Sequence, residues 1–282
     1  MLNTTKTLLG SLLTFFFLVF PACATCGAPL IDKKPQTDLP APYRHTYFYQ
    51  SQTIPTDGIW QTDDMDISRV DENKKLVAFT FDDAPTSHTE NLVALFAAYN
   101  EENPDCPASA TLFFNGIRLA PQDKTLLSAA LTVGFELGNH TQNHLDLTAL
   151  SQADLEKEIQ SVDDYLQTLD GKPHHLLRAP YGKINDTVKQ AAHAPIIDWT
   201  VDTLDWQNRS AEKIYQTVMQ GVFDGAIVLM HDGYPQTQIA LKRLLPDLKS
   251  AGYQVLSVSQ LAKANHCTLK TGGVYIRARK QK

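Results

Sequence analysis

Short apolar runs recur along residues 73–264, and each ends in a cluster of polar side chains. Runs of this length, rich in β-branched and aromatic residues and bounded by Gly, Pro or Asp, predict buried strands. The runs occupy residues 77–81, 133–137, 174–177, 194–197 and 226–230. Because the carboxyl ends of parallel strands meet at one rim, we expect the five polar clusters to lie together.

The segments between these runs show apolar residues at helical spacing. Ser151 and Asp154 form an N-cap pair, and an apolar stripe at helical spacing follows them. The stripe consists of Leu155, Ile159, Val162, Leu166 and Leu169. Similar stretches begin near Glu90, Asp123, Asn185, Ser210 and Gln236. Strand and helix alternate throughout, so the predicted fold class is α/β, with a parallel barrel.

The first residues predict export from the cytoplasm. Lys6 precedes an apolar stretch at 8–20, which is too short to span a bilayer comfortably but suits the core of a signal peptide. Small residues around Cys23 favour cleavage after Ala24, giving a signal peptide at 1–24. The alternative is a lipoprotein signal in which Cys23 is the lipidated residue. Either way, we expect the mature chain in the periplasm or cell envelope, or secreted, with no stable membrane span.

Length and charge set the remaining organisation of the 282 residues. A formal net charge of −6 and a pI near 5.8 argue against a nucleic-acid partner. Residues 25–72 are rich in proline and predict an extended lead-in to one catalytic domain at 73–264. The basic tail at 265–282 carries Gly272-Gly273 and predicts a short hairpin. A monomer is expected.

Cysteine usage in an exported chain raises the question of disulfide bonds. After cleavage at Ala24, Cys26, Cys106 and Cys267 would remain. A Cys106–Cys267 bridge that holds the C-terminal tail is the predicted pairing. No cysteine is close to a plausible base, which argues against a thiol nucleophile.

The strongest chemical signal combines Asp82-Asp83 with two histidines four residues apart, His140 and His144. Histidines at this spacing share a helical face or a tight turn, so both rings can point at one cation. A carboxylate would complete a three-ligand site with an open position for water. Either pattern alone is common on protein surfaces. Their position after buried strands favours an active site for metal-assisted hydrolysis.

Five motifs together resemble those of the polysaccharide deacetylases, the NodB-like domains of carbohydrate esterase family 4. In order they are residues 80–83, 140–144, 178–182, 205–206 and 229–231. The resemblance covers roughly residues 73–264, and the order and spacing of all five make it specific. It implies a distorted (β/α) barrel of the NodB type and a metal-dependent enzyme that removes acetyl groups from sugar polymers.

The resemblance also implies a metal site and a general base. Asp83, His140 and His144 would bind the metal, with Zn²⁺ as the expected ion and Co²⁺ or Ni²⁺ compatible with the same ligands. Asp82 would accept a proton from the attacking water. Arg178 would pair with Asp82 and keep it ionised.

The remaining implied roles concern the oxyanion, the leaving group and the substrate pocket. The backbone N–H of Tyr181 would bind the oxyanion. His231 would act as general acid, oriented by Asp205. Trp206 and Leu229 would line the pocket for the acetyl methyl group. The chain departs from the family at Ala84-Pro85, where the family usually has glycine after the aspartate pair, and this departure points to a different substrate loop.

Competing interpretations remain at single residues. Asp198 and Asp202 lie in the same segment as Asp205, which is preferred because it directly precedes Trp206. Thr141 is expected to hydrogen-bond the ligand-carrying loop. The other histidines have no comparable setting and are read as surface or loop residues; they are His88, His174, His175, His193 and His266.

The leading functional prediction is an exported N-deacetylase acting on N-acetylglucosamine residues of peptidoglycan or chitin-like oligomers. An acetylxylan-type O-acetyl esterase would use the same groups. A non-catalytic glycan-binding protein is disfavoured because no matched catalytic position is missing. A non-haem Fe(II) oxygenase also uses two histidines and a carboxylate, but it leaves Asp82, Arg178 and His231 without a role.

Overall fold

A computed structural model describes residues 58–62 and 64–280 of the chain, all within one compact unit. The predicted signal peptide, Cys23, Cys26 and most of the lead-in at 25–72 lie outside the described residues. Within the described part, no helix has the length and apolarity needed to span a bilayer.

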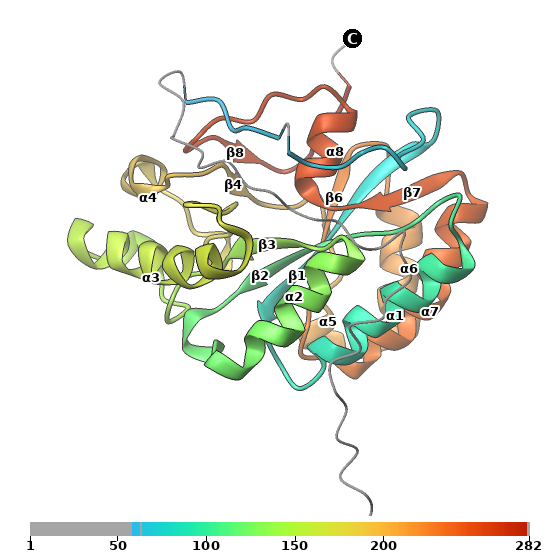
Figure 1. Ribbon diagram of the computed structural model, residues 1–282, viewed down its shortest axis with the longest axis horizontal. Coiled ribbons are helices and arrows are strands. Elements are labelled where there is room, and N and C mark those ends of the chain that lie inside the picture. The colour runs from blue at the N-terminus through green and yellow to red at the C-terminus, as the bar shows by residue number, and fades with distance from the viewer. Residues whose placement is uncertain (1–57, 63, 281–282) are drawn as a thin grey trace, which may run out of the picture. The chain divides into compact units, whose positions relative to one another are not determined.

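Eight strands build a distorted (β/α) barrel, as the alternating pattern predicted (Figure 1). The main sheet has the order β3-β2-β1-β6-β5, with β7 beside the start of β1, and its pairings are parallel. Its strands are β1 (Lys75–Ala84), β2 (Thr111–Phe114), β3 (Glu136–Asn139), β5 (Val201–Asp202), β6 (Ala226–His231) and β7 (Tyr253–Leu256). Single bridges through Leu177 connect β3 to the pair formed by β4 (Ile196–Ile197) and β8 (Val274–Tyr275).

Helices lie between most of the strands, and most of them cover the outer side of the sheet (Figure 1). They are α1 (Thr89–Glu102), α2 (Lys124–Val133), α3 (Gln152–Asp170), α4 (Asp186–Ala191), α5 (Asp205–Asn208), α6 (Ala211–Gly221), α7 (Pro235–Ser250) and α8 (Val258–Ala264). Short 3₁₀ turns include η2 (Gly116–Arg118) and η5 (Pro180–Gly182). The predicted N-cap of α3 is confirmed, because the Ser151 hydroxyl accepts the backbone N–H of Asp154.

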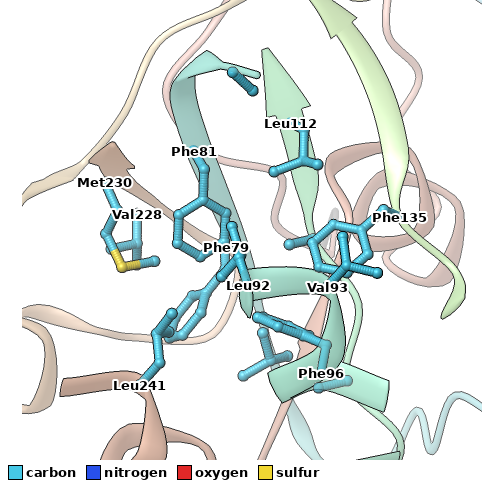
Figure 2. Packing of buried hydrophobic residues seen from close by; sticks show 14 of the residues in the cluster. Phe79, Phe81, Leu92, Val93, Phe96, Leu112, Phe135, Val228, Met230 and Leu241 are labelled. Atoms are coloured by element: carbon cyan, nitrogen blue, oxygen red, sulfur yellow. The ribbon is translucent and has the colours of Figure 1, made fainter. Parts of the chain in front are cut away.

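The alternation of side chains along β1 creates two different faces. Phe79 and Phe81 point toward α1 and α7, where they pack with Phe96 and Leu241 in the larger apolar cluster (Figure 2). Each such buried side chain contributes about 1.5–3 kcal/mol to stability. The opposite face carries Leu76 and Ala78, which join a second cluster closed by α8. Every second residue of β1 lies on this inner face, so residue 80 and then residue 82, near the carboxyl end of the strand, also lie there.

The C-terminal segment is part of the barrel, so the hairpin predicted for the basic tail is wrong. The expected turn does form, with Gly272 at φ 69° and the Gly273 N–H bonded to the Lys270 carbonyl at 3.0 Å. The strand that follows nevertheless pairs in parallel with β4. The β4 strand offers open N–H groups there, and those of Ile196 and Asp198 donate to the tail. Pairing with this existing edge satisfies the backbone better than a free hairpin does.

The two described cysteines are free thiols, so the predicted Cys106–Cys267 bridge is also wrong. Cys106 is buried next to β7, with its sulfur 3.9 Å from the carbonyl of Tyr253. Cys267, like Tyr275 of β8, packs instead against the cluster under α8. The pairing was inferred from positions in the sequence, and the fold places the two residues against different strands.

Candidate metal centre and active site

The predicted polar clusters meet at the carboxyl ends of the strands. Asp82 at the end of β1 lies directly beside His231 at the end of β6 in the parallel register. His140 follows β3, and Asp205 follows β5 at the start of α5. Arg178 follows Leu177, the residue that bridges β3 and β4. Parallel strands therefore bring together groups that are far apart in the sequence.

Asp83, His140 and His144 form a group with the composition and spacing of a metal site. One ligand atom from each lies within 4.8 Å of the others. The Asp83 Oδ1 atom is 3.9 Å from His140 Nε2 and 3.8 Å from His144 Nε2. His140 Nδ1 is 2.8 Å from the Arg178 carbonyl, to which it donates, so the lone pair is on Nε2 facing the other ligands. Two imidazoles and one carboxylate fit a divalent cation such as Zn²⁺.

The two histidines are held by a tight turn, which settles the choice between a turn and a helix. Thr141 and His144 have φ values of 69° and 55°, and Asp83 has 66°. Left-handed backbone at such residues is costly, and its concentration here is typical of functional sites. The His144 N–H donates to the Thr141 hydroxyl at 3.2 Å, which confirms the expected role of Thr141. Ala84 is outside the left-handed region, so its methyl group is accommodated where the family has glycine.

Asp82 and Arg178 form a buried ion pair beside this group. Asp82 is 4% exposed and Arg178 is fully buried. The guanidinium Nη1 donates to Asp82 Oδ1 at 2.8 Å, which leaves Asp82 Oδ2 at 3.6 Å from His140 Nε2. Burial acts to raise the pKa of Asp82, but the opposing charge of Arg178, with those of His140 and His231, lowers it overall.

Arg178 is fixed by several partners in the barrel interior. Its Nη1 also donates to the Thr80 hydroxyl at 2.7 Å, and its Nε donates to the Ile197 carbonyl at 3.0 Å. The guanidinium lies 4.3 Å from the ring centroid of Phe113. Thr80 is two residues before Asp82 on the inner face of β1. Because Thr80 and Asp82 lie on the same face of β1, this strand provides Arg178 with both a hydrogen-bond acceptor and a charge partner.

His231 and Asp205 form the second pair. His231 Nδ1 is 2.7 Å from Asp205 Oδ1. The other oxygen of Asp205 accepts the backbone N–H of His231 at 2.8 Å and the Thr237 hydroxyl at 2.7 Å. Burial acts to lower the pKa of His231, but the hydrogen bond to Asp205 and the charges of Asp82 and Asp205 raise it overall. The preference for Asp205 over its neighbours agrees with these contacts, because the Asp202 carboxylate instead accepts the Leu204 N–H.

Of three further predicted residues, two are exposed near these pairs and the third is buried. Tyr181 is 65% exposed, has φ 62°, and donates its hydroxyl to the His144 carbonyl at 3.3 Å. Trp206 is half exposed beside Asp205, whereas Leu229 of β6 is buried. The aromatic surfaces of Tyr181 and Trp206 thus stand open to solvent near the centre.

Two buried acidic groups near the site were missed by sequence analysis. Asp232 follows His231, and one of its oxygens accepts the hydroxyls of Thr86 and Thr89 and the Thr86 N–H. These bonds brace the loop after Asp83 against β6. The position of Asp232 directly after a candidate catalytic histidine was an available signal. The sequence around Asp163 of α3 gave no indication of its role, because the residues that it contacts are determined by how α3 packs in the fold.

The expectation that His174 and His175 are surface or loop residues is wrong for His175. That ring is fully buried between Asp163 and Asp170. His174 is partly buried, with Nδ1 3.3 Å from Asp163 Oδ2. Packing of α3 over the segment before Arg178 buries both, which no local pattern reveals. His193 and His266 are exposed as expected.

Comparisons with known proteins agree with this geometry. A family model described as polysaccharide deacetylase matches residues 69–195. The chain is 35% identical to a peptidoglycan-N-acetylglucosamine deacetylase of Bacillus cereus, over 70% of this chain and 92% of the relative. It is 34% identical to the peptidoglycan-N-acetylmuramic acid deacetylase PdaC of Bacillus subtilis, over 68% of this chain but only 40% of the relative.

Two further similarities concern xylan and a solved structure. A bifunctional xylanase/deacetylase of Pseudobutyrivibrio xylanivorans is 30% identical over 67% of this chain and 31% of its own length. The solved structure of a T48 deacetylase with substrate superposes with a TM-score of 0.66 at 30% identity, covering 73% of this chain and 99% of that one.

Proposed function

Because this chain belongs to the polysaccharide deacetylase family, we propose that it hydrolyses the acetamide of N-acetylglucosamine residues in an envelope glycan. The products are glucosamine residues and acetate. One observation carries the proposal: a three-ligand metal group lies beside a buried Asp82–Arg178 pair, and His231–Asp205 is adjacent in the strand register. Each group that amide hydrolysis needs is present.

Asp83, His140 and His144 are the proposed metal ligands, and Zn²⁺ is the proposed ion. When bound, a divalent cation polarises the amide carbonyl and lowers the pKa of a water molecule toward about 7. Co²⁺ and Ni²⁺ are compatible with the same donor set. The hydrogen bond from His140 Nδ1 to the Arg178 carbonyl supports this assignment, because it presents Nε2 as a ligand.

Asp82 is the proposed general base. Its Oδ1 is occupied by the guanidinium of Arg178, so Oδ2 on the side of His140 is the atom that accepts the proton from the attacking water. Arg178 keeps the carboxylate ionised although it is buried, which a base requires. The backbone N–H of Tyr181 is the proposed donor to the oxyanion that forms on the carbonyl oxygen.

His231 is the proposed general acid. Asp205 holds the Nδ1–H, so the proton delivered to the departing nitrogen comes from Nε2. The raised pKa of His231 favours the protonated form that a general acid needs. Base and acid lie on adjacent strands at paired positions and can therefore act on the same scissile bond.

An O-acetyl esterase on xylan is the second candidate, favoured by the similarity to the xylanase/deacetylase. The proposed groups would also cleave an ester. The oxygen that leaves an ester depends less on protonation by His231 than the nitrogen of an amide does. Trp206 and Leu229 would accept the acetyl methyl group in either case. A non-catalytic glycan-binding protein is disfavoured, because every proposed catalytic group is present and hydrogen-bonded. An Fe(II) oxygenase leaves the Asp82–Arg178 pair unexplained.

The proposal is tested by acetate release from chitopentaose, intact peptidoglycan and acetylxylan, before and after chelation and after Zn²⁺ is restored. We expect metal-dependent acetate with an equal yield of new sugar amines from an N-acetylated substrate. Acetate from xylan alone, without amines, would favour the esterase. A His144→Ala variant is the control and should release no acetate. Export is proposed from the N-terminal pattern, and cell fractionation tests it.

A further inference from the structure

The turn that carries His140 and His144 is tied to α3 by its backbone N–H groups. The N–H of Gln142 donates to the Glu158 carbonyl at 2.8 Å, and that of Asn143 donates to the Glu158 carboxylate at 2.8 Å. The side-chain amide of Asn143 also donates to this carboxylate. On the opposite side, η2 donates to the carbonyls of the turn from Gly116 and Ile117. The turn therefore takes its shape from its neighbours and not from its own sequence alone.

Asn139, the last residue of β3, links this turn to a deeper part of α3. The Asn139 side chain is fully buried, and its Oδ1 accepts the Thr141 N–H at 2.9 Å. Its Nδ2 donates to the Ile159 carbonyl and to Asp163 Oδ1, both at 2.9 Å. Because Thr141 lies between the two histidines and has left-handed backbone, the orientation of Asn139 constrains both ligands.

Asp163 is in turn held by His175. His175 Nδ1 is 3.0 Å from Asp163 Oδ1, and Nε2 is 3.2 Å from Asp170 Oδ1. Both ring nitrogens face carboxylates, so both carry a proton and the ring is a cation. Although burial opposes this charge, the two carboxylates raise the pKa of His175 to about 9. The cluster thus contains an imidazolium that compensates the buried carboxylate on which Asn139 depends.

We propose that His175 is a positioning residue for the metal site, acting through Asp163 and Asn139 on the turn that carries His140 and His144. The inference rests on the proposed metal ligands. His175 touches neither those ligands nor the catalytic pairs. Its effect is to keep Asp163 charged and in place, so that the Asn139 amide has one orientation. Groups behind metal ligands typically contribute a factor of 10–100 to metal affinity.

Removing the cation has a specific consequence. In His175→Gln, Asp163 loses the imidazolium beside Oδ1, the oxygen that binds Asn139, and keeps only the partly buried His174 near Oδ2 at 3.3 Å. A buried carboxylate that loses such a partner is strongly destabilised. It must take up a proton or move, and either change disturbs its bond with Asn139. In His175→Gln/Asp163→Asn, the two substituted side chains are neutral and can hydrogen-bond to each other, while Asp170 keeps its carboxylate. The double variant should therefore recover metal affinity relative to the His175→Gln single variant.

The test measures the dissociation constant of Zn²⁺ for the metal-free full chain, by competition with a chromophoric chelator at pH 7. We expect Zn²⁺ to bind about 10–100 times more weakly to His175→Gln than to wild type. Recovery in the double variant would distinguish positioning from a general loss of structure. His266→Gln, which removes an exposed histidine, is the matched control and should bind Zn²⁺ like wild type.

A folded His175→Gln variant with wild-type Zn²⁺ affinity would overturn the proposal, and so would a double variant weaker than either single one. Should His175→Gln fail to fold, Asp163→Asn decides: weaker Zn²⁺ binding and faster hydrogen exchange at the Thr141 amide support the proposal, and unchanged values refute it. A wild-type chain that binds no Zn²⁺ would instead refute the proposed metal site itself.

Discussion

Replacing Arg178 with methionine tests the buried ion pair on which the proposed base depends. The variant keeps much of the side-chain volume but removes the charge and the hydrogen bonds to Asp82, Thr80 and Ile197. Asp82 then remains buried without its hydrogen-bonded charge partner. Breaking a buried pair in this way costs about 3–5 kcal/mol. That is a large part of the roughly 5–15 kcal/mol that separates a folded domain from its unfolded state.

The expected loss is measured by urea unfolding of the metal-free protein, so that metal binding does not contribute. Arg243→Met is the matched control, because Arg243 Nη1 is 2.7 Å from Glu212 but both side chains are more than half exposed. An exposed pair contributes about 0–1 kcal/mol. Adding Asp82→Asn to Arg178→Met should restore part of the lost stability, since the unpaired charge is removed.

The pH dependence of the Arg178→Met effect follows from the pKa of Asp82. That pKa is lowered on folding, so ionised Asp82 stabilises the wild type above the ordinary aspartate pKa of 3.8, and this contribution is lost as the pH falls through the lowered pKa. The stability difference between wild type and Arg178→Met should therefore be largest near neutral pH and shrink in acid. The acidic limb of kcat/KM should move to higher pH, because the base is harder to ionise.

Two results would refute this reasoning. One is an Arg178→Met protein whose free energy of unfolding at pH 7 is within 1 kcal/mol of the wild-type value, as for the exposed control. The other is an unchanged acidic limb in a folded variant. Either would mean that Arg178 does not keep Asp82 ionised.

Three further predictions concern the acid, the substrate surface and the thiols. In Asp205→Asn, His231 loses the charge that raises its pKa, so the alkaline limb of kcat/KM should move to lower pH; an unmoved limb would exclude His231 as the acid. Trp206→Ala should raise KM for oligosaccharides by up to about tenfold, with little change in unfolding free energy, and an unchanged KM would argue against its place in the substrate surface. Without reductant, both Cys106 and Cys267 should react with iodoacetamide after unfolding, whereas a cross-linked peptide in a non-reduced digest would contradict the free thiols.

Local sequence patterns were sufficient to predict the site residues that lie at the ends of strands. The apolar run of β1 predicts a buried strand, and its alternation places Thr80 and Asp82 on one face. The parallel architecture places the carboxyl ends of both strands at one rim, and the pairing of β1 with β6 then sets Asp82 beside His231. The resemblance of five motifs supplied Arg178 and Asp205, whose partners in the structure agree with it.

Other features depend on contacts between distant segments and could not be read from the sequence. His175 follows another histidine in an apolar context, and only the packing of α3 against it provides Asp163 and Asp170. The tail after Gly273 pairs with β4, which lies 78 residues earlier in the chain. Spacing alone also left open whether His140 and His144 share a helix or a turn. The left-handed backbone at Thr141, which decides for the turn, depends on bonds from Asn139 and η2.

The most direct test of the account compares wild type with Asp82→Asn for both Zn²⁺ binding and acetate release from an N-acetylated glycan. Asp82 is proposed to be the base and not a ligand. The variant should therefore bind one Zn²⁺ with an affinity close to that of the wild type, while acetate release falls by about 10²–10⁴-fold. Asp82→Asn with full activity and bound Zn²⁺ would contradict the assignment of the base and the proposed hydrolytic mechanism.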